Sequence, residues 1–220
     1  MIRVTIFVLL ALTAPLSRAA DTPQWRENLE RYAKEHLEHP AWGTAHAHRD
    51  YKLTLELARK SQMKVDDDSI FAAAMLHDIG AIEGFAKPGV EHMARALELI
   101  DPILIEAGFP KEKIPLVRTI VSHHMYFSDP TDQPTEAVLF RDADTLDFLG
   151  TIGVLRIFAL TGKHRWATDI DTAEATVRKN AADLPARLTT PAARTIATVR
   201  VAEMETLLSQ LAHEKKGVLE

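Results

Sequence analysis

Apolar residues recur every three or four positions along most of the chain, which is the period of an amphipathic α-helix. The pattern predicts helices that begin at Thr22-Pro23, at Gly43-Thr44 and near Ile70, the third ending before Gly80. Further helices are expected over residues 90–107, 114–124, 136–149, 152–160, 172–180 and 191–215, with Pro102 as a potential break. No segment alternates as a half-buried strand does, and no internal repeat is present. The sequence therefore predicts an all-α, single-domain helical bundle.

The first 19 residues have a different pattern. Arg3 precedes an apolar run over residues 4–12, and Pro15 is followed by Ser17-Arg18-Ala19. This is the layout of a secretory signal cleaved after Ala19. The alternative is a membrane anchor, but the apolar run is shorter than the roughly 20 residues that cross a bilayer. We therefore expect a domain over 20–220 that is periplasmic or secreted and has no stable membrane association after cleavage.

Composition narrows the chemistry. The chain has 220 residues, ten histidines, no cysteine and a net charge of −5. The lack of cysteine excludes disulfides, thiolate ligands and a cysteine nucleophile. No cluster of Lys and Arg is present, so we expect a small-molecule substrate rather than nucleic acid. A metal would be held by nitrogen and oxygen donors, which suit Mn, Fe, Ni, Co, Zn or Mg.

Five successive predicted helices carry histidine or aspartate. The candidates are His46, His77, Asp78, His92, His123, His124, Asp142 and Asp144. Helical bundles build metal sites from side chains on facing helices. The apolar run over residues 72–76 ends directly in His77-Asp78, and burying such a pair is costly unless something holds it. These positions favour a metal centre inside the bundle.

Each candidate also has a simpler interpretation. A single histidine on an amphipathic helix is commonly a surface or hydrogen-bonded residue. The His77-Asp78 pair could cap the end of its helix, although this leaves the preceding apolar run unexplained. Asp144 could instead be the buried partner of Arg49 or Arg141.

The segments "HAHR", "AAMLHDIG" and "FRDADTLDFLG" follow one another in this order over about residues 40–160. Together they resemble the HD superfamily of metal-dependent phosphohydrolases. The family pattern is a His with Arg three residues later, an apolar helix that ends in His-Asp-Ile-Gly, and a late Ala-Asp-x-Leu-Asp. The resemblance implies an HD-type helical bundle, with C-terminal helices over 170–216, and a metal centre that activates water.

The resemblance also implies which residues bind the metal. His46 matches the first His because Arg49 follows three residues later, and His48 is the second choice. His77 and Asp78 match the central doublet. Asp144 matches the late aspartate, with Asp142 as the second choice.

Some branches of the family hold two metals through two additional histidines. Here "GVEHMARA" offers His92 and "IVSHH" offers His123, and Asp78 would bridge the two ions. A single-metal site, with His92 and His123 contacting substrate, is the alternative. In either case Asp78 would accept a proton from water, and His123 or His124 would supply one to the leaving group. Candidates to neutralise a phosphate are Arg49, Arg141 and Lys87.

Departures from the pattern keep the substrate open. Many members have Lys directly after His-Asp-Ile-Gly, where this chain has Ala81. The segment after His124 lacks the Glu and the Gly-Tyr-Pro of the cyclic-dinucleotide branch. The stretch over residues 39–58 also resembles the cyanamide hydratase-like branch, whose substrates are small and uncharged. The resemblance as a whole favours a hydrolase of phosphate esters. These departures leave two alternatives, namely a hydratase or di-iron oxygenase that acts on a small neutral molecule, and a non-catalytic metal-binding protein.

Overall fold

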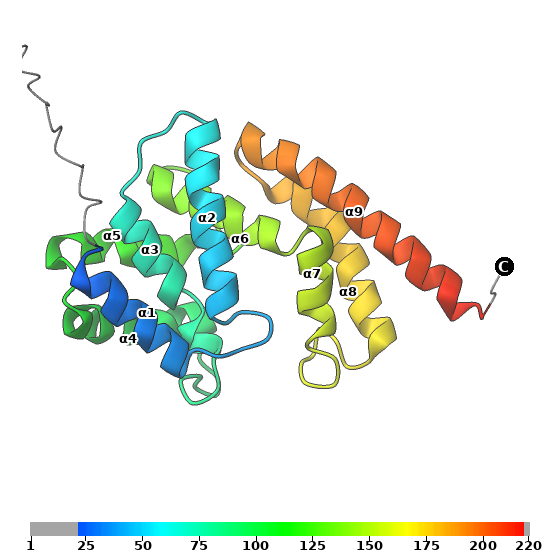
Figure 1. Cartoon of the computed structure of the whole chain (residues 1–220), viewed down its shortest axis with the longest axis horizontal. Helices are drawn as coiled ribbons and strands as arrows, with labels where there is room; N and C mark the ends of the chain where they lie inside the picture. The colour runs from blue at the N-terminus through cyan, green and yellow to red at the C-terminus, as the bar shows by residue number, and fades with distance from the viewer. Residues whose placement is uncertain (1–21, 218–220) are drawn as a thin grey trace, which may run out of the picture.

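The computed structural model describes residues 22–217, and these residues form an all-helical protein (Figure 1). The α-helices are α1 (Gln24–His36), α2 (Thr44–Lys60), α3 (Asp67–Leu76), α4 (His92–Ala107), α5 (Ile114–His123), α6 (Thr135–Asp147), α7 (Gly150–Phe158), α8 (Ile170–Asp183) and α9 (Pro191–Lys215). Short 3₁₀ turns η1 (Ile79–Ala81), η2 (Lys111–Lys113) and η3 (Leu184–Arg187) connect some of them. Within the described residues the β-structure is limited to one isolated bridge between His164 and Ala167. The predicted fold class is confirmed.

The helices pack around two hydrophobic cores. Helices α1, α3, α4 and α5 surround the first core, and α7, α8 and α9 surround the second. Helices α2 and α6 pack against each other between the two groups and contribute residues to both cores (Figure 1). Every residue of α6 from Leu139 to Asp147 is buried. The polar side chains of this segment must therefore find partners inside the protein.

Helix α3 is buried on all sides, which explains its apolar sequence. Asp66 caps its N-terminus by accepting a hydrogen bond from the Ser69 backbone N–H at 2.8 Å. All residues from Ser69 to Leu76 are buried, so the helix ends in the interior, at His77. The apolar run thus places the His77-Asp78 pair at the centre of the molecule.

Gly80 follows this pair because α4 passes directly over it. A Cβ atom at Gly80 would lie 2.1 Å from the carbonyl oxygen of His92 and 2.9 Å from the Ala96 backbone nitrogen. No side chain fits between the two backbones at that separation. The glycine therefore allows η1 and the start of α4 to come together.

The predicted helices correspond to those of the structure, with differences of a few residues at their ends. Helix α4 runs through Pro102 without a break, because Ile100 and Leu104 on either side are fully buried in the first core. The predicted segments 152–160 and 172–180 correspond to α7 and to the longer α8. The predicted signal segment, residues 1–19, lies outside the described residues.

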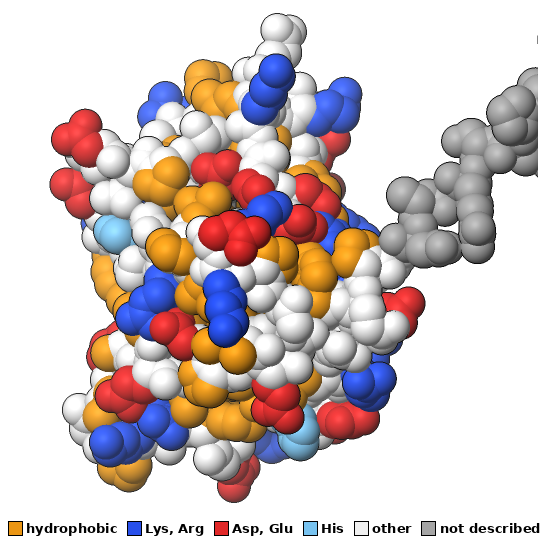
Figure 2. All heavy atoms as spheres, turned by 90° about the vertical axis from the view of Figure 1, so that its left-hand side faces the viewer, with side chains coloured by type: hydrophobic (Ala, Val, Ile, Leu, Met, Phe, Trp, Pro, Cys, Tyr) orange, Lys and Arg blue, Asp and Glu red, His pale blue; other side chains and the backbone are white. Residues whose placement is uncertain are grey.

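The surface carries no single dominant charge on the face formed by α1, α4 and α5. Figure 2 shows acidic and basic side chains interspersed there with small apolar areas. Among residues 22–217, no helix combines the length and the hydrophobicity required to cross a bilayer.

Candidate metal centre

Three helices bring their polar residues to one buried point. Helix α2 supplies His46 and Asp50, one turn apart, and the end of α3 supplies His77. Helix α6 supplies Asp144 from the segment that is buried throughout. The four side chains offer ligand atoms that all lie within 4.8 Å of one another. We call this set the His46 group.

The two imidazoles are the centre of the His46 group. Their Nε2 atoms are 3.2 Å apart. The Nε2 atom of His46 also lies 3.0 Å from Asp50 Oδ2 and 3.4 Å from Asp144 Oδ1. All four side chains are at most 4% exposed. Such proximity of ring nitrogens and carboxylate oxygens is typical of a metal site, in which each atom donates a lone pair to one ion.

A second set of donors lies next to the first. Asp78 Oδ1 is 3.7 Å from His124 Nε2 and 3.9 Å from His92 Nε2, and these three residues form what we call the His124 group. The other oxygen of Asp78, Oδ2, lies 3.3 Å from His77 Nε2 and 3.5 Å from His46 Nε2. Asp78 therefore lies between the two groups, with one oxygen facing each.

All four histidines of the two groups are oriented in the same way. The Nδ1 atom of each is held by an oxygen: Asp147 Oδ2 at 2.8 Å for His46, Ala74 O at 3.0 Å for His77, Val121 O at 2.7 Å for His124 and Glu91 Oε1 at 2.5 Å for His92. A nitrogen that donates its proton to such an oxygen leaves the Nε2 lone pair free. Metal-ligating histidines are fixed in this way in proteins.

Asp147 contacts one of these histidines, and sequence reasoning gave it no role. Besides His46, it binds Arg49 through a bidentate pair at 2.7 and 2.8 Å, and Arg156 at 2.8 Å. Burial raises the pKa of Asp147, but the bonds from His46 and Arg49 and the charge of Arg156 outweigh burial and hold that pKa well below its ordinary value. Asp147 is thus an ionised carboxylate that orients His46.

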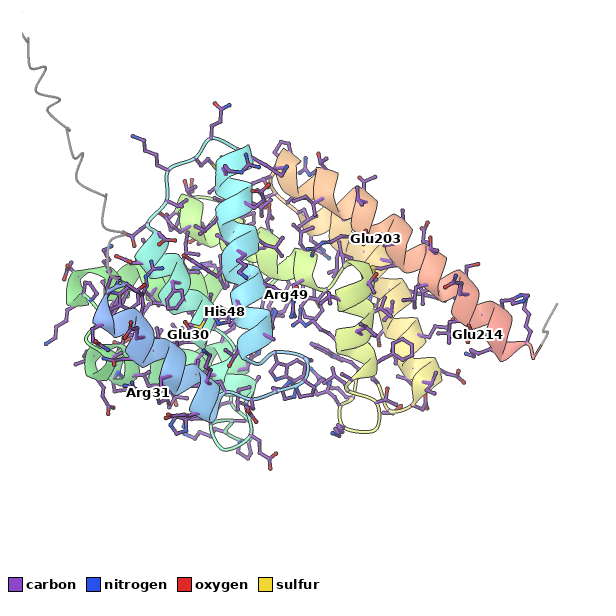
Figure 3. The ribbon with its side chains drawn as sticks, viewed as in Figure 1. Glu30, Arg31, His48, Arg49, Glu203 and Glu214 are labelled. Atoms are coloured by element: carbon purple, nitrogen blue, oxygen red, sulfur yellow. The ribbon has the colours of Figure 1, made fainter. Side chains whose placement is uncertain are left out.

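The two candidates for the first histidine of the motif, His46 and His48, lie in different surroundings. His46 is buried in the centre, whereas His48 points away from it, with Nε2 3.6 Å from Glu30 of α1 (Figure 3). Arg49 lies on a different side of α2 from His48 (Figure 3). It pairs with Asp147 instead of Asp144. The spacing between His46 and Arg49 therefore reflects a common partner, Asp147.

The second aspartate choice on α6 has a structural role. Asp142 accepts hydrogen bonds from the backbone N–H groups of Thr189 and Thr190 at 2.8 and 2.7 Å, and from the Thr190 hydroxyl at 2.8 Å. It anchors the segment that leads into α9 and lies outside both donor groups. Asp144, two residues further on, points to the opposite side of the helix, into the His46 group.

His123 is not brought to either donor group. Its Nδ1 atom lies 2.9 Å from Thr119 O and 2.8 Å from Ser122 Oγ, whereas the neighbouring His124 is fully buried in the centre. Adjacent residues differ by about 100° around a helix, so only one of the two histidines can face inward. Ile120 and Val121 are buried four and three residues before His124, and this spacing is the signal in the sequence that favours His124.

The remaining predicted substrate cations do not reach the centre. Arg141 is buried, and its guanidinium donates to the carbonyl oxygens of Arg187 at 2.9 Å and Tyr126 at 2.7 Å. Lys87 is exposed in the loop between η1 and α4. Arg49 is bound to Asp147 as described above.

The electrostatics of the centre favour a cation. Burial and the charge of Arg156 lower the pKa of His46, but Asp50, Asp144 and Asp147 outweigh them and raise it well above its ordinary value. Burial raises the pKa of Asp50 to about 8. In the His124 group, burial and then the charge of His77 lower the pKa of His124 to about 4, so its imidazole is neutral at pH 7. The concentration of carboxylates that raises the pKa of an imidazole would equally attract a divalent ion.

The residues present fit divalent metal. Both oxygens of Asp50 and the Nε2 atom of His124 are buried and have no hydrogen-bond partner among the described residues. Unpartnered polar atoms of this kind are costly in a protein interior unless an ion satisfies them. All the donors are nitrogen or oxygen atoms, which suits the metals expected from the sequence.

A cavity of about 460 Å³ opens onto the centre. Asp78, His92 and Asp144 are among the residues that line it, so both donor groups border the cavity. Its walls are mainly aromatic and include Trp42, Tyr126, Phe127, Phe148, His164 and Trp166. Arg165 is the only Lys or Arg that lines it within the described part of the chain. The cavity is large enough for a small organic molecule.

The fold and this centre together define an all-α protein with a cluster of histidine and aspartate side chains between its helices that could hold a metal ion. Residues 42–149 match the family model described as HD domain. The chain therefore carries an HD domain and belongs to the HD superfamily, as its three motifs indicated. A search among curated proteins found no relative.

Solved structures show the same fold. A protein from Lactobacillus plantarum is 22% identical with a TM-score of 0.65, covering 90% of this chain and 99% of that one. YpgQ of Bacillus subtilis, in a structure described as a complex with ADP, is 21% identical with a TM-score of 0.64, covering 86% and 97%. A structure from Bacillus thuringiensis described as an HD-superfamily hydrolase is 23% identical with a TM-score of 0.59, covering 88% and 97%.

Proposed function

We propose that this protein is a metal-dependent hydrolase that cleaves a phosphate ester at a two-metal centre. The observation that carries the proposal is the position of Asp78, which presents one oxygen to the His46 group and the other to the His124 group. Two ions joined by one carboxylate are a common arrangement in phosphatases and nucleases.

Charge balance supports two ions rather than one. When a bound ion keeps Asp50 ionised, Asp50, Asp78 and Asp144 together carry one more negative charge than that single divalent ion neutralises. A phosphate would be repelled from that site, since Arg165 is the only nearby cation that lines the cavity within residues 22–217. With a second ion on the His124 group the centre becomes positive, and a phosphate is attracted to it.

The chain's own residues would divide the work between them. When bound, the ions would supply water activation near neutral pH and polarisation of the bond to be cleaved. Asp78, which lines the cavity, would accept the proton of the attacking water. His124 is neutral at pH 7 and its Nδ1–H is held by Val121, so we assign it as a ligand rather than as the proton donor.

The cavity walls indicate the kind of ester. Trp42, Phe148 and Trp166 offer flat apolar surfaces next to the centre. Such surfaces would stack on a planar group, such as a nucleobase or an aromatic alcohol, attached to the phosphate. The described complex of the Bacillus subtilis relative with ADP is in keeping with a substrate of this class.

The test is phosphate release by the purified protein loaded with Mn²⁺, Co²⁺ or Ni²⁺, on a panel of aryl, alkyl and nucleoside phosphates. We expect release only with metal, and its loss in Asp78→Ala. Asp183→Ala, on the exposed end of α8, is the matched control that should retain activity. The proposal is wrong if the metal-loaded protein releases phosphate from none of the panel.

A second candidate is a hydratase or oxygenase that acts on a small neutral molecule. The observation in its favour is the scarcity of cations at the cavity, where Ala81 and the aromatic walls replace the lysine and arginine of a phosphate site. For this function the phosphate panel would give no product. Iron in the protein as isolated, together with substrate-dependent oxygen consumption, would identify the oxygenase.

We also propose that the protein is exported, on the basis of the pattern of its first 19 residues. The expected result is a chain that begins at Ala20 in the periplasmic fraction or the medium. N-terminal sequencing of the protein from its own host tests this, and a chain with an intact N-terminus in the cytosol would contradict it.

A further inference from the structure

Asp50 is the member of the centre that the family motifs do not assign. It lies one turn after His46 on α2, so both side chains face the same side of the helix. Its side chain is fully buried. Oδ2 is 3.0 Å from His46 Nε2 and 3.7 Å from His77 Nε2.

The protein itself leaves this carboxylate without a partner. Neither oxygen of Asp50 accepts a hydrogen bond from any described residue, despite the short distance to His46. Two equally buried aspartates of the same region are fully bonded: Asp142 accepts three hydrogen bonds, and Asp147 binds His46, Arg49 and Arg156. An unpartnered buried carboxylate costs several kcal/mol, so such a residue needs a compensating charge.

We propose that Asp50 is a direct ligand of the ion held by the His46 group, and this inference rests on the metal centre of the proposed function. The ligand atoms of His46, Asp50, His77 and Asp144 surround a common point, and Asp78 Oδ2 faces the same point from the end of α3. Counting Asp78, five protein groups can bind this ion. Three of the five are carboxylates.

This donor set determines which metals suit the site. Zn²⁺ prefers four ligands in a tetrahedron, and a catalytic zinc usually has three from the protein. Five groups, most of them oxygen donors, favour an ion that accepts five or six ligands, such as Mn²⁺ or Fe²⁺. Asp50 therefore biases the His46 group toward Mn²⁺ or Fe²⁺.

The variant Asp50→Asn tests the assignment, because it removes the charge and keeps the size. Binding of Mn²⁺ to the metal-stripped protein is measured by isothermal titration calorimetry, and the coordination number is followed by the visible spectrum of the Co²⁺-loaded protein. The matched control is Thr54→Val, one turn further along α2 and equally buried, where a hydroxyl bonds the carbonyl oxygen of residue 50 at 2.7 Å.

We expect Asp50→Asn to weaken Mn²⁺ binding at least about ten-fold and to change the Co²⁺ spectrum, since even partners that only orient a ligand have effects of this size. Thr54→Val should do neither. If Asp50→Asn leaves the affinity or the spectrum as in the wild type, the assignment is overturned.

A measurement on the unaltered protein keeps the inference testable if the variant fails to fold. In a crystal structure of the Mn²⁺-loaded wild type, an Asp50 oxygen should lie about 2.2 Å from the ion, as a carboxylate ligand does. A separation beyond about 3 Å would overturn the assignment. If the wild type binds no divalent ion at all, the proposed function fails as well. If it binds ions without Asp50, only this inference fails.

Discussion

Replacing Asp147 with asparagine tests how the centre is held in place. Asp147 is 1% exposed and joins His46 of α2 to Arg156 of α7 and to Arg49. The asparagine has nearly the same volume, so the variant removes a charge without creating a cavity. In the variant, Arg156 is still buried (4% exposed) and has only the carbonyl oxygen of Ala41 as a hydrogen-bond acceptor. The Nδ1 atom of His46 no longer has a carboxylate to bind.

The size of the effect follows from burial. Breaking a buried ion pair by removing one partner costs about 3–5 kcal/mol, because the other charge stays buried. Arg49 is 32% exposed and can turn to water, so its share is within about 1 kcal/mol. The carbonyl of Ala41 continues to accept from Arg156, which favours the lower end of the range. We therefore expect a loss of about 3 kcal/mol, or about 10 °C in melting temperature for a domain of this size.

The same substitution should weaken metal binding, because His46 loses the group that orients it. Partners of this kind typically contribute 10- to 100-fold to metal affinity. The assays are thermal unfolding of the metal-stripped protein and Mn²⁺ titration by calorimetry. The control is Asp183→Asn, whose pair with Lys179 is exposed and should change the stability by less than about 1 kcal/mol. An Asp147→Asn variant with wild-type melting temperature and wild-type Mn²⁺ affinity would refute the reasoning.

Three further outcomes follow from the structure. Gly80→Ala should cost about 2 kcal/mol in urea unfolding, because its Cβ would meet the carbonyl oxygen of His92 and displace the start of α4. A normal unfolding midpoint would contradict this close approach. His124→Ala should reduce the Mn²⁺ content, measured by elemental analysis, from two ions per chain toward one, whereas His123→Ala should keep both ions. The reverse result would mean that His123, and not His124, is the ligand. Removing metal with a chelator should lower the melting temperature, since an ion at 100 times its Kd contributes about 2.7 kcal/mol, and an unchanged melting temperature would argue against a bound ion.

Much of the site was predictable because its motifs are local. The end of an apolar helix at His77-Asp78, and Gly80 two residues after the pair, are visible in the sequence. The first follows from the burial of α3 and the second from the approach of α4. The structure buries His46, and not His48, among the donor side chains. Arg49 pairs with Asp147, which lies 98 residues after it. A spacing within one helix can thus reflect a partner that lies far away along the chain.

Other residues could not be assigned without the packing of the helices. Arg141 was expected at a phosphate, but its surroundings are backbone carbonyls from distant loops, which no pattern near position 141 reveals. Asp50 was not singled out, because a carboxylate on an amphipathic helix is normally a solvated residue. Only the burial of α2 against α3 and α6 makes it a member of the centre.

The sequence by itself determined the helices, the family and the central doublet, because hydrophobic period and short motifs act over a few residues. The tertiary structure decided between His123 and His124, placed Asp50 and Asp147 beside His46, and surrounded the centre with aromatic walls. The physical reason is that a rotation of about 100° separates neighbouring residues on a helix. Which side of a helix faces the interior is fixed only when the other helices pack against it.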